Sequence, residues 1–143
     1  MEEGKLLGHI ISKDGIWIDP SRVQAIQQID FHRSKKEIQE FNGKMNFLHR
    51  FIPNLAEPLR ELTNILNKDN DVKWFEDTKK SFNSIKFALN TAPVLISPDY
   101  IIDFIIFSFS SQHTMAVVLI QKRDKTELPI SFFSHNIRDA TLL

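Results

Sequence analysis

The spacing of the apolar residues changes at Pro98. Between about residue 20 and this point apolar residues recur every three or four positions, as in Ile38, Phe41, Met45 and Leu48, which is the period of a helix that buries one face. After it, apolar residues run in three short stretches, 101–109, 114–121 and 128–133. Turn-forming residues separate these stretches, which predicts three consecutive antiparallel strands. A helical part followed by such a sheet is an α+β arrangement.

The first twenty residues predict a β-hairpin that leads into a short helix. The apolar runs 6–11 and 16–18 are separated by a Lys-Asp-Gly turn that ends at Gly15, and Asp-Gly between β-branched stretches is a strong hairpin signal. Asp19 and Pro20 then suit the N-cap and the first position of a helix. The helix carries its apolar residues at helical spacing, at Val23, Ile26 and Ile29.

The next helix has the clearest start in the chain. Ser34 and Glu37 form a capping-box pair, in which the serine hydroxyl accepts from the Glu37 backbone and the glutamate reaches back. The apolar pattern continues to Ile52, and Pro53 stops it.

Two further helices are predicted before Pro98. One begins with Pro58 as its first helical residue, a position that tolerates proline. The other covers 76–89, with Asn90 as its C-cap.

A second line of residues runs along the strongest helix, on the side away from the apolar stripe. Gln39, Gly43 and Phe47 are four residues apart and therefore stack along one face. Lys36, Lys44 and Arg50 flank this line. A glycine inside a helix costs about 1 kcal/mol relative to alanine, so something should approach the backbone at Gly43. The approaching group is either a ligand or a second helix, in which case Phe47 joins the core.

The amino-acid composition limits the classes of function that the chain can have. Eighteen basic residues balance eighteen acidic ones, which counts against strong autonomous binding to nucleic acid. The chain has no cysteine, so disulfides, thiolate zinc sites and a cysteine nucleophile are excluded. The longest apolar tract, 101–109, contains Asp103 and is too short to span a bilayer. The N-terminus lacks a signal-peptide core, and an intracellular location, cytoplasmic or nuclear, is expected.

Titratable residues show no spacing typical of a catalytic or metal site. The five histidines are dispersed, and His49 is expected to pack or to lie at the surface. The acidic cluster of Asp69, Asp71, Glu76 and Asp77 is expected to solvate a loop and to start the helix that follows.

Several motifs occur in an order that resembles a known family. The tract EIQEFNGKMNFLHRFI over 37–52 is followed by Trp74, Phe82, Ile85-Lys86, Leu89 and the segment APVL over 92–95. This order resembles the region after the polymerase palm in reverse transcriptases of gypsy-type LTR retrotransposons. The resemblance covers roughly 6–136. It implies a palm-edge hairpin over 1–20, a helical thumb and connection over 21–92, and a partial RNase H-like domain over 93–143.

The resemblance also implies a set of nucleic-acid contacts. In the family the thumb helix lies against the minor groove of the template–primer duplex. Carried over, Gln39 hydrogen-bonds, Gly43 admits the sugar–phosphate ridge and Phe47 packs on a sugar, in contacts that read duplex shape. Gly8 and His9, in the triplet that begins at Leu7, match a motif that lies near the primer strand. The implied partners are an RNA–DNA hybrid or a DNA duplex, and the remainder of a polyprotein or another chain that completes the sheet.

Catalytic residues of the family are not matched in this chain. The family's first RNase H strand ends in an aspartate that binds metal, and matching outward from Gln121 puts Phe109 there. A phenyl ring cannot coordinate Mg²⁺, the ion expected in an intact family member. Thr114 and Ala116 also replace the usual glycines. The palm aspartates are expected to precede Met1. We therefore expect no cofactor in this chain and neither polymerase nor RNase H activity from it alone.

Two other interpretations stay open. In the first, the chain is a protein-interaction or structural fragment that binds its partner through the apolar strands 101–109 and 117–120, because an incomplete sheet leaves an unpaired edge. Alternatively it is a decayed retroelement relic without a selected role.

Overall fold

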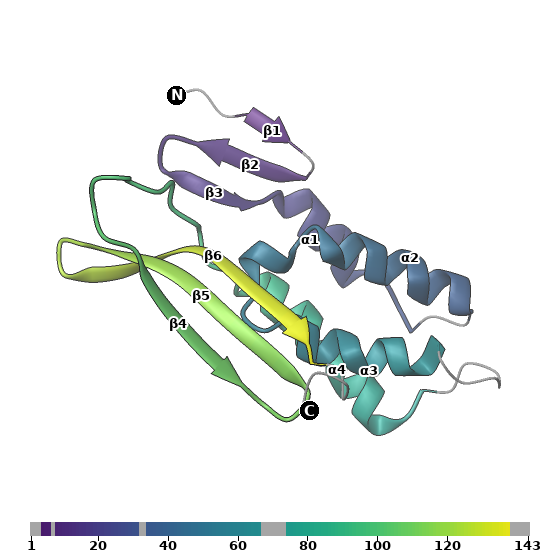
Figure 1. Ribbon diagram of the computed structural model, residues 1–143. Coiled ribbons are helices and arrows are strands. Elements are labelled where there is room, and N and C mark those ends of the chain that lie inside the picture. The colour runs from purple at the N-terminus through teal and green to yellow at the C-terminus, as the bar shows by residue number, and fades with distance from the viewer. Residues whose placement is uncertain (1–3, 7, 32–33, 67–73, 138–143) are drawn as a thin grey trace.

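The computed structural model describes residues 4–6, 8–31, 34–66 and 74–137. Two separate three-stranded antiparallel sheets, β1–β2–β3 and β4–β5–β6, lie beside a group of helices (Figure 1). This arrangement confirms the predicted α+β class. The elements in chain order are β1 (Gly4–Leu6), β2 (His9–Ser12), β3 (Gly15–Ile18), α1 (Pro20–Gln27), α2 (Lys35–Asn46), the 3-10 helix η1 (His49–Phe51), α3 (Ala56–Leu66), α4 (Glu76–Asn90), β4 (Ile105–Ser110), β5 (Thr114–Arg123) and β6 (Thr126–Asn136).

The N-terminal sheet contains the predicted hairpin and one strand more. β2 and β3 pair with Ile10 opposite Trp17, as the sequence predicts. The run 6–11 is not one strand, however, because the chain turns between β1 and β2, where Gly8 has a positive φ of 81°. Asp19 caps α1 as predicted, and its side chain accepts a 3.0 Å hydrogen bond from the Ser21 amide.

The capping box of α2 is confirmed, but the predicted end of this helix is wrong. The Ser34 hydroxyl accepts from the Glu37 amide and the Glu37 carboxylate accepts from the Ser34 amide, both at 3.2 Å. The helix ends at Asn46, not at Ile52. The chain tightens into η1 instead, so that Leu48, Phe51, Ile52 and Leu55 can all be buried.

Two other predicted helix ends are also wrong by a few residues. α3 begins at Ala56, so Pro58 occupies its third position rather than its first. Proline is tolerated there because the amides of the first turn have no partner within the helix. α4 includes Asn90, and Thr91 is its C-cap, with its amide donating to the Phe87 carbonyl at 3.1 Å.

The core lies between the helices and is rich in aromatic rings. The rings of Phe41 on α2 and Phe82 on α4 have centroids 5.1 Å apart, and Phe31 and Trp74 pack against Phe82 at 5.5 and 5.6 Å. Lys86 lies over the Phe82 ring at 4.8 Å. The apolar faces of α2, α3 and α4 therefore meet in one cluster, as their periodicity predicts.

The C-terminal sheet begins later and extends further than the sequence predicts. β4 starts at Ile105 rather than at 101 because the preceding residues form a turn around the buried side chain of Gln121. The Gln121 amide accepts from the Asp99 amide at 2.9 Å and donates to the Ile102 carbonyl at 3.0 Å. β5 and β6 are joined by Asp124 and Lys125, whose φ angles of 51° and 66° suit a two-residue hairpin turn.

A short backbone link joins the N-terminal sheet to the segment after α4. Ile16 and Leu95 exchange two hydrogen bonds of 2.8 Å each. Gly15 makes this approach possible, because a Cβ at its position would lie 2.5 Å from Val94 Cγ1 and its φ is 146°. The APVL segment is thus attached to β3.

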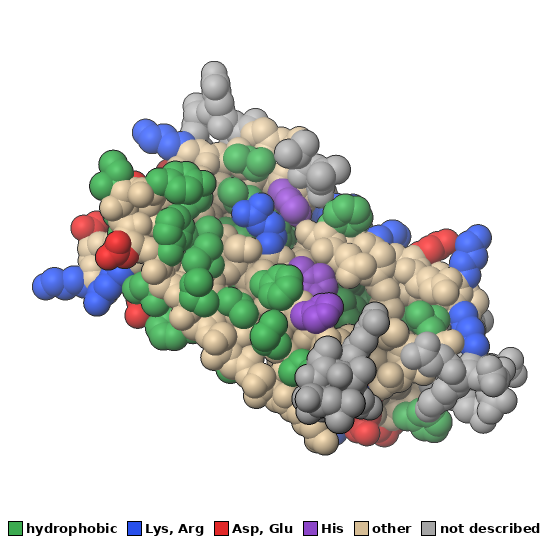
Figure 2. Space-filling view, viewed as in Figure 1, with side chains coloured by type: hydrophobic (Ala, Val, Ile, Leu, Met, Phe, Trp, Pro, Cys, Tyr) green, Lys and Arg blue, Asp and Glu red, His purple; other side chains and the backbone are tan. Residues whose placement is uncertain are grey.

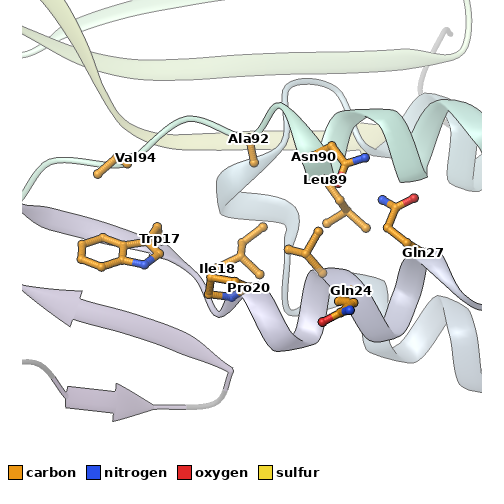
Figure 3. Close-up of a pocket in the computed structure, with 10 residues that line it drawn as sticks. Trp17, Ile18, Pro20, Gln24, Gln27, Leu89, Asn90, Ala92 and Val94 are labelled. Carbon is orange, nitrogen blue, oxygen red and sulfur yellow. The ribbon is translucent and has the colours of Figure 1, made fainter.

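An apolar groove of about 680 Å³ lies beside this link, between α1 and the end of α4 (Figure 3). Trp17 and Val94 lie at one end and the amides of Gln27 and Asn90 at the other. The Gln27 amide is already engaged, since it donates to the Lys86 carbonyl at 2.6 Å. The groove is thus closed at this end by a contact between α1 and α4.

Replacement of Phe82 by alanine should destabilise the fold strongly. The ring is buried at the centre of the aromatic cluster, so its removal should cost about 3–5 kcal/mol. Urea unfolding followed by circular dichroism would measure the loss. Phe87→Ala is the matched control on the same helix, because that ring is 70% exposed and should change stability by no more than about 0.5 kcal/mol. Equal losses for the two variants would contradict the described core.

Candidate nucleic-acid interface

The outer face of α2 presents the line of residues that the sequence singles out. Gln39, Gly43 and Phe47 are all exposed, and Phe47 is exposed to 58%. Phe47 follows the last residue of α2, but its φ of −72° and ψ of −14° continue the helical conformation. The three residues therefore still stack one turn apart.

The surface over Gly43 is open. A Cβ at Gly43 would have no described residue's atom within 4 Å, beyond the helix's own turns. Close packing against a second helix within the described residues is thus excluded as the reason for this glycine. The exposure of Phe47 likewise excludes a place in the core. The remaining predicted reason is the approach of a ligand.

The predicted basic residues divide into two groups. Lys36 and Lys44 are exposed on α2 and border the line. Arg50 lies on η1 instead, because α2 ends early, and its guanidinium lies 5.7 Å from the centre of the Phe51 ring. Arg50 therefore does not flank the line on the same helix, contrary to the prediction.

Gly8 is brought to the end of α2 by the packing of the N-terminal sheet. It lines a groove of about 330 Å³ together with Phe47 and three residues of the α1 start, Asp19, Ser21 and Arg22. The Arg22 side chain crosses directly over Gly8, where a Cβ would lie 2.0 Å from Nη1. Sequence reasoning missed Arg22, because nothing in the pattern of α1 relates it to a helix that begins thirteen residues later. Leu7 lies outside the described residues.

His9 faces inward from the same corner. Its ring meets the Phe51 ring edge-on, with centroids 4.7 Å apart. Burial lowers the pKa of His9 from its ordinary 6.5, and the charges of Arg50 and Arg22 lower it further, against a hydrogen bond to the Phe47 backbone that raises it. Burial also lowers the pKa of His49, whose Nδ1 lies 3.3 Å from Ser134 Oγ. Both imidazoles are therefore favoured in the neutral form.

Phe109 lies near the end of β4, opposite Ala116 of β5, and is 55% exposed. Within the described residues, no group of three or more histidine or acidic side chains could hold a metal ion. Glu76 and Asp77 occupy the first turn of α4, as predicted, whereas Asp69 and Asp71 lie outside the described residues. No helix in the described part is long and apolar enough to cross a bilayer.

Comparison with known proteins identifies the origin of this arrangement. Residues 74–142 match the model of an RNase H-like domain found in reverse transcriptase. Over 146 residues the chain is 32% identical to the retrovirus-related Pol polyprotein from transposon 297 of Drosophila melanogaster, covering 99% of this chain. The chain belongs to the reverse transcriptase and RNase H-like family of retroelement Pol polyproteins. The predicted retroelement origin is confirmed.

Solved reverse transcriptases share the fold. The foamy viral protease-reverse transcriptase in complex with dsDNA superposes with a TM-score of 0.82 at 26% identity, covering 99% of this chain and 30% of that one. The same enzyme in complex with an RNA/DNA hybrid gives a TM-score of 0.80 at 27% identity, with 96% and 19% covered. The chain spans only 13% of the transposon 297 polyprotein. The division at residues 20 and 92 and the roles of the site residues stay predictions.

Gly43→Ala should stabilise the folded chain by roughly 0.5–1 kcal/mol. Alanine restricts the unfolded backbone and has the better helix propensity, and its methyl group would meet open space here. Thermal or urea unfolding of the two proteins would measure the difference. A loss of stability would show that the space over Gly43 is filled in the isolated chain.

Stability should fall as the pH drops below about 6.5, the ordinary pKa of histidine. The folded-state pKa values of His9 and His49 are both lowered, so the unfolded chain binds more protons in this range. The contribution of these two histidines to the stability of the fold is present above their pKa in the unfolded chain. It is lost as the pH falls through their lower pKa values in the folded chain. Urea midpoints at pH 7.5 and pH 5.5 test this, and the double variant His9→Gln/His49→Gln should show a flatter dependence. Hydrogen bonds from Ser21 lower the pKa of Asp19 as well. Asp19 therefore changes the pH dependence of stability only below its ordinary pKa of 3.8.

Proposed function

We propose that this chain contacts double-stranded nucleic acid, an RNA–DNA hybrid or a DNA duplex, through the outer face of α2 as a thumb helix. The observation that carries the proposal is Gly43, an exposed glycine in the middle of a helix with open space above it. Such a glycine lowers helix stability, and the described packing gives no compensating contact. A glycine at this position would let the backbone of a partner approach the helix closely, which explains its presence.

Each residue of the line has a distinct role in this contact. The Gln39 amide offers donors and an acceptor to base edges in the minor groove. Gly43 lets the sugar–phosphate ridge approach the helix backbone. The exposed ring of Phe47 packs on a sugar. Because such contacts follow groove shape more than base identity, the binding is expected to depend weakly on sequence.

Charge makes this contact a weak one in the isolated chain. Lys36 and Lys44 border the line on α2, and Arg22 lies in the groove at its end. Glu37 and Glu40 lie on the same helix, and the whole chain has a formal net charge of zero. Few phosphates can therefore be neutralised, so the affinity should be modest and the salt dependence shallow.

The solved relatives support a duplex as the partner. The foamy viral enzyme has been solved in complex with dsDNA and with an RNA/DNA hybrid, and it superposes on nearly the whole of this chain. RNA-directed DNA synthesis and degradation of the RNA strand are proposed to need other parts of a polyprotein. If Phe109 stands at the family's metal-binding aspartate, as the resemblance implies, its phenyl ring supports the view that the chain is inactive alone. An intracellular site of action, cytoplasmic or nuclear, is proposed with it.

Binding to a fluorescently labelled RNA–DNA hybrid should be lost in the double variant Gln39→Ala/Phe47→Ala. The two substitutions remove the groove contacts and leave Lys36, Lys44 and Arg22 in place, so a loss of at least about tenfold in affinity is expected. Gly43→Leu should weaken binding similarly, because it fills the open space. Fluorescence anisotropy at 50 and 150 mM salt would measure both effects.

Phe87→Ala is the matched control for this experiment. It removes an exposed phenyl ring from α4, away from the proposed face, and should bind like the unchanged chain. Binding that survives in the α2 variants, or that falls equally with Phe87→Ala, would exclude the outer face of α2 as the interface.

A further inference from the structure

Lys86 reaches from α4 to the carbonyl end of α1. Its ammonium donates to the Gln27 carbonyl at 3.2 Å and to the Ile29 carbonyl. In return the side-chain amide of Gln27, which points from α1 toward α4 in Figure 3, donates to the Lys86 carbonyl at 2.6 Å. The Lys86 stem also brings Nζ to 4.8 Å from the centre of the buried Phe82 ring. The two helices are thus joined by a reciprocal Lys86–Gln27 link, from each side chain to the backbone of the other residue.

The end of α1 is a place that favours a cation. The last carbonyls of a helix have no partner within it, and they form the negative end of its dipole. All eight residues of α1 are described, and none in its last turn is basic. Lys86 supplies the missing charge from a different helix, where the carbonyls and the face of the Phe82 ring both suit an ammonium.

Apolar burial alone holds α1 weakly. Of its eight residues only Ile26 is buried, and Val23 packs partly against the core. A helix of this length spans about 12 Å, and so short a helix is not stable without contacts to the rest of the fold. The direction of α1 therefore depends on the Lys86–Gln27 link at one end and on its contacts at the other.

The other end of α1 lies at the proposed interface. The amide of the N-cap residue Asp19 donates to the Gly8 carbonyl at 3.0 Å. Arg22, in the first turn, crosses over Gly8 and lines a groove together with Phe47. Arg22 lies about 7.5 Å along the axis from the linked end of α1, so a tilt of about 10° there would move it by about 1.3 Å.

The position of Arg22 matters because basic charge is sparse on this molecule. Figure 2 shows basic and acidic side chains dispersed over one face, with no continuous basic patch among the described residues there. The formal net charge of the whole chain is zero. Each cation that meets a phosphate therefore supplies a large share of the electrostatic attraction to a duplex.

We propose that Lys86 is a positioning residue of the duplex interface. By capping the carbonyl end of α1 from α4, it holds Arg22 beside Phe47, where the guanidinium meets a backbone phosphate of the duplex that α2 contacts. Lys86 itself lies at the opposite end of α1 and acts through Arg22. This inference rests on the proposed function.

A double-mutant cycle separates this role from a general loss of stability. Lys86→Met keeps the stem over Phe82 and removes the ammonium. It should weaken binding to the labelled RNA–DNA hybrid about three- to tenfold, and Arg22→Met should do the same. Because both changes remove one contact, the double variant should bind no more weakly than Arg22→Met alone. Lys86→Arg should restore binding, since a guanidinium can also donate to the two carbonyls.

Lys80→Met is the matched control for the change in charge. It removes the same charge from an exposed position on the same helix, and it should bind the hybrid like the unchanged chain. A loss equal to that of Lys86→Met would show that net charge alone is responsible.

Hydrogen exchange of the Asp19 amide, followed by NMR, tests the positioning without nucleic acid. This amide donates to the Gly8 carbonyl, so its exchange rate reports whether the start of α1 stays on the turn at Gly8. Lys86→Met should speed exchange at Asp19 at least about tenfold relative to the Phe41 amide in α2. Since this result does not depend on hybrid binding, failure of the inference is distinguishable from failure of the proposed function.

Three results would overturn the proposal. One is a double variant whose loss equals the two single losses combined, which gives Lys86 and Arg22 separate roles. Another is full-strength binding by Lys86→Met. The third is an exchange rate at Asp19 that Lys86→Met leaves unchanged.

Discussion

The rest of this structure depends on the burial of one stripe of α2 against α3 and α4. Ile38, Phe41 and Met45 are buried, and the contact of Phe41 with Phe82 fixes the rotation of the helix about its axis. Because a helix has two sides, this rotation also decides what faces outward. Gln39, Gly43 and Phe47 lie at the surface because the opposite, apolar face of the helix is buried in the core. The candidate interface is thus a consequence of core packing.

The two sheets join this helical core through apolar packing, which includes Ile18 of β3 and Phe132 of β6, and through a few polar contacts. Ile16 and Leu95 connect the N-terminal sheet to the segment after α4. The Ser134 hydroxyl accepts from the Ala56 amide at the start of α3 and lies beside the His49 ring, which anchors β6. Gln121 holds the turn before β4. These contacts fasten β6 to the helices and leave β4 on the outside, where its apolar rows have no cover among the described residues.

The chain therefore carries two exposed surfaces of different chemistry. The face of α2 is open, with uncovered space over Gly43 among the described residues and with Lys36 and Lys44 exposed beside it. The strand β4 carries no charged residue, and Ile106, Phe107 and Phe109 are exposed on it. A relative such as the transposon 297 polyprotein is far longer than this chain.

The sequence by itself determined the features that depend on neighbouring residues. The capping box at Ser34, the cap at Asp19, the apolar period of the helices and the hairpin before Pro20 are all local, since each involves residues within one or two turns. The order of motifs from the tract of α2 to APVL identified the family, because its residues, from Trp74 and Phe82 to Leu95, are those that build the shared core.

Only the tertiary structure decided the features that join distant residues. α2 ends at Asn46 because Phe51 and Ile52 are buried in a tighter turn, which no local pattern of that segment required. From the sequence, Gly43 could allow either close helix packing or the approach of a ligand. The space above it is open in the packed structure, which depends on where α3 and α4 lie. Arg22 and Phe47 line the same groove only because of the tertiary fold. The physical reason is that periodicity fixes which face of an element is apolar, whereas the partner of that face depends on how all the elements pack together.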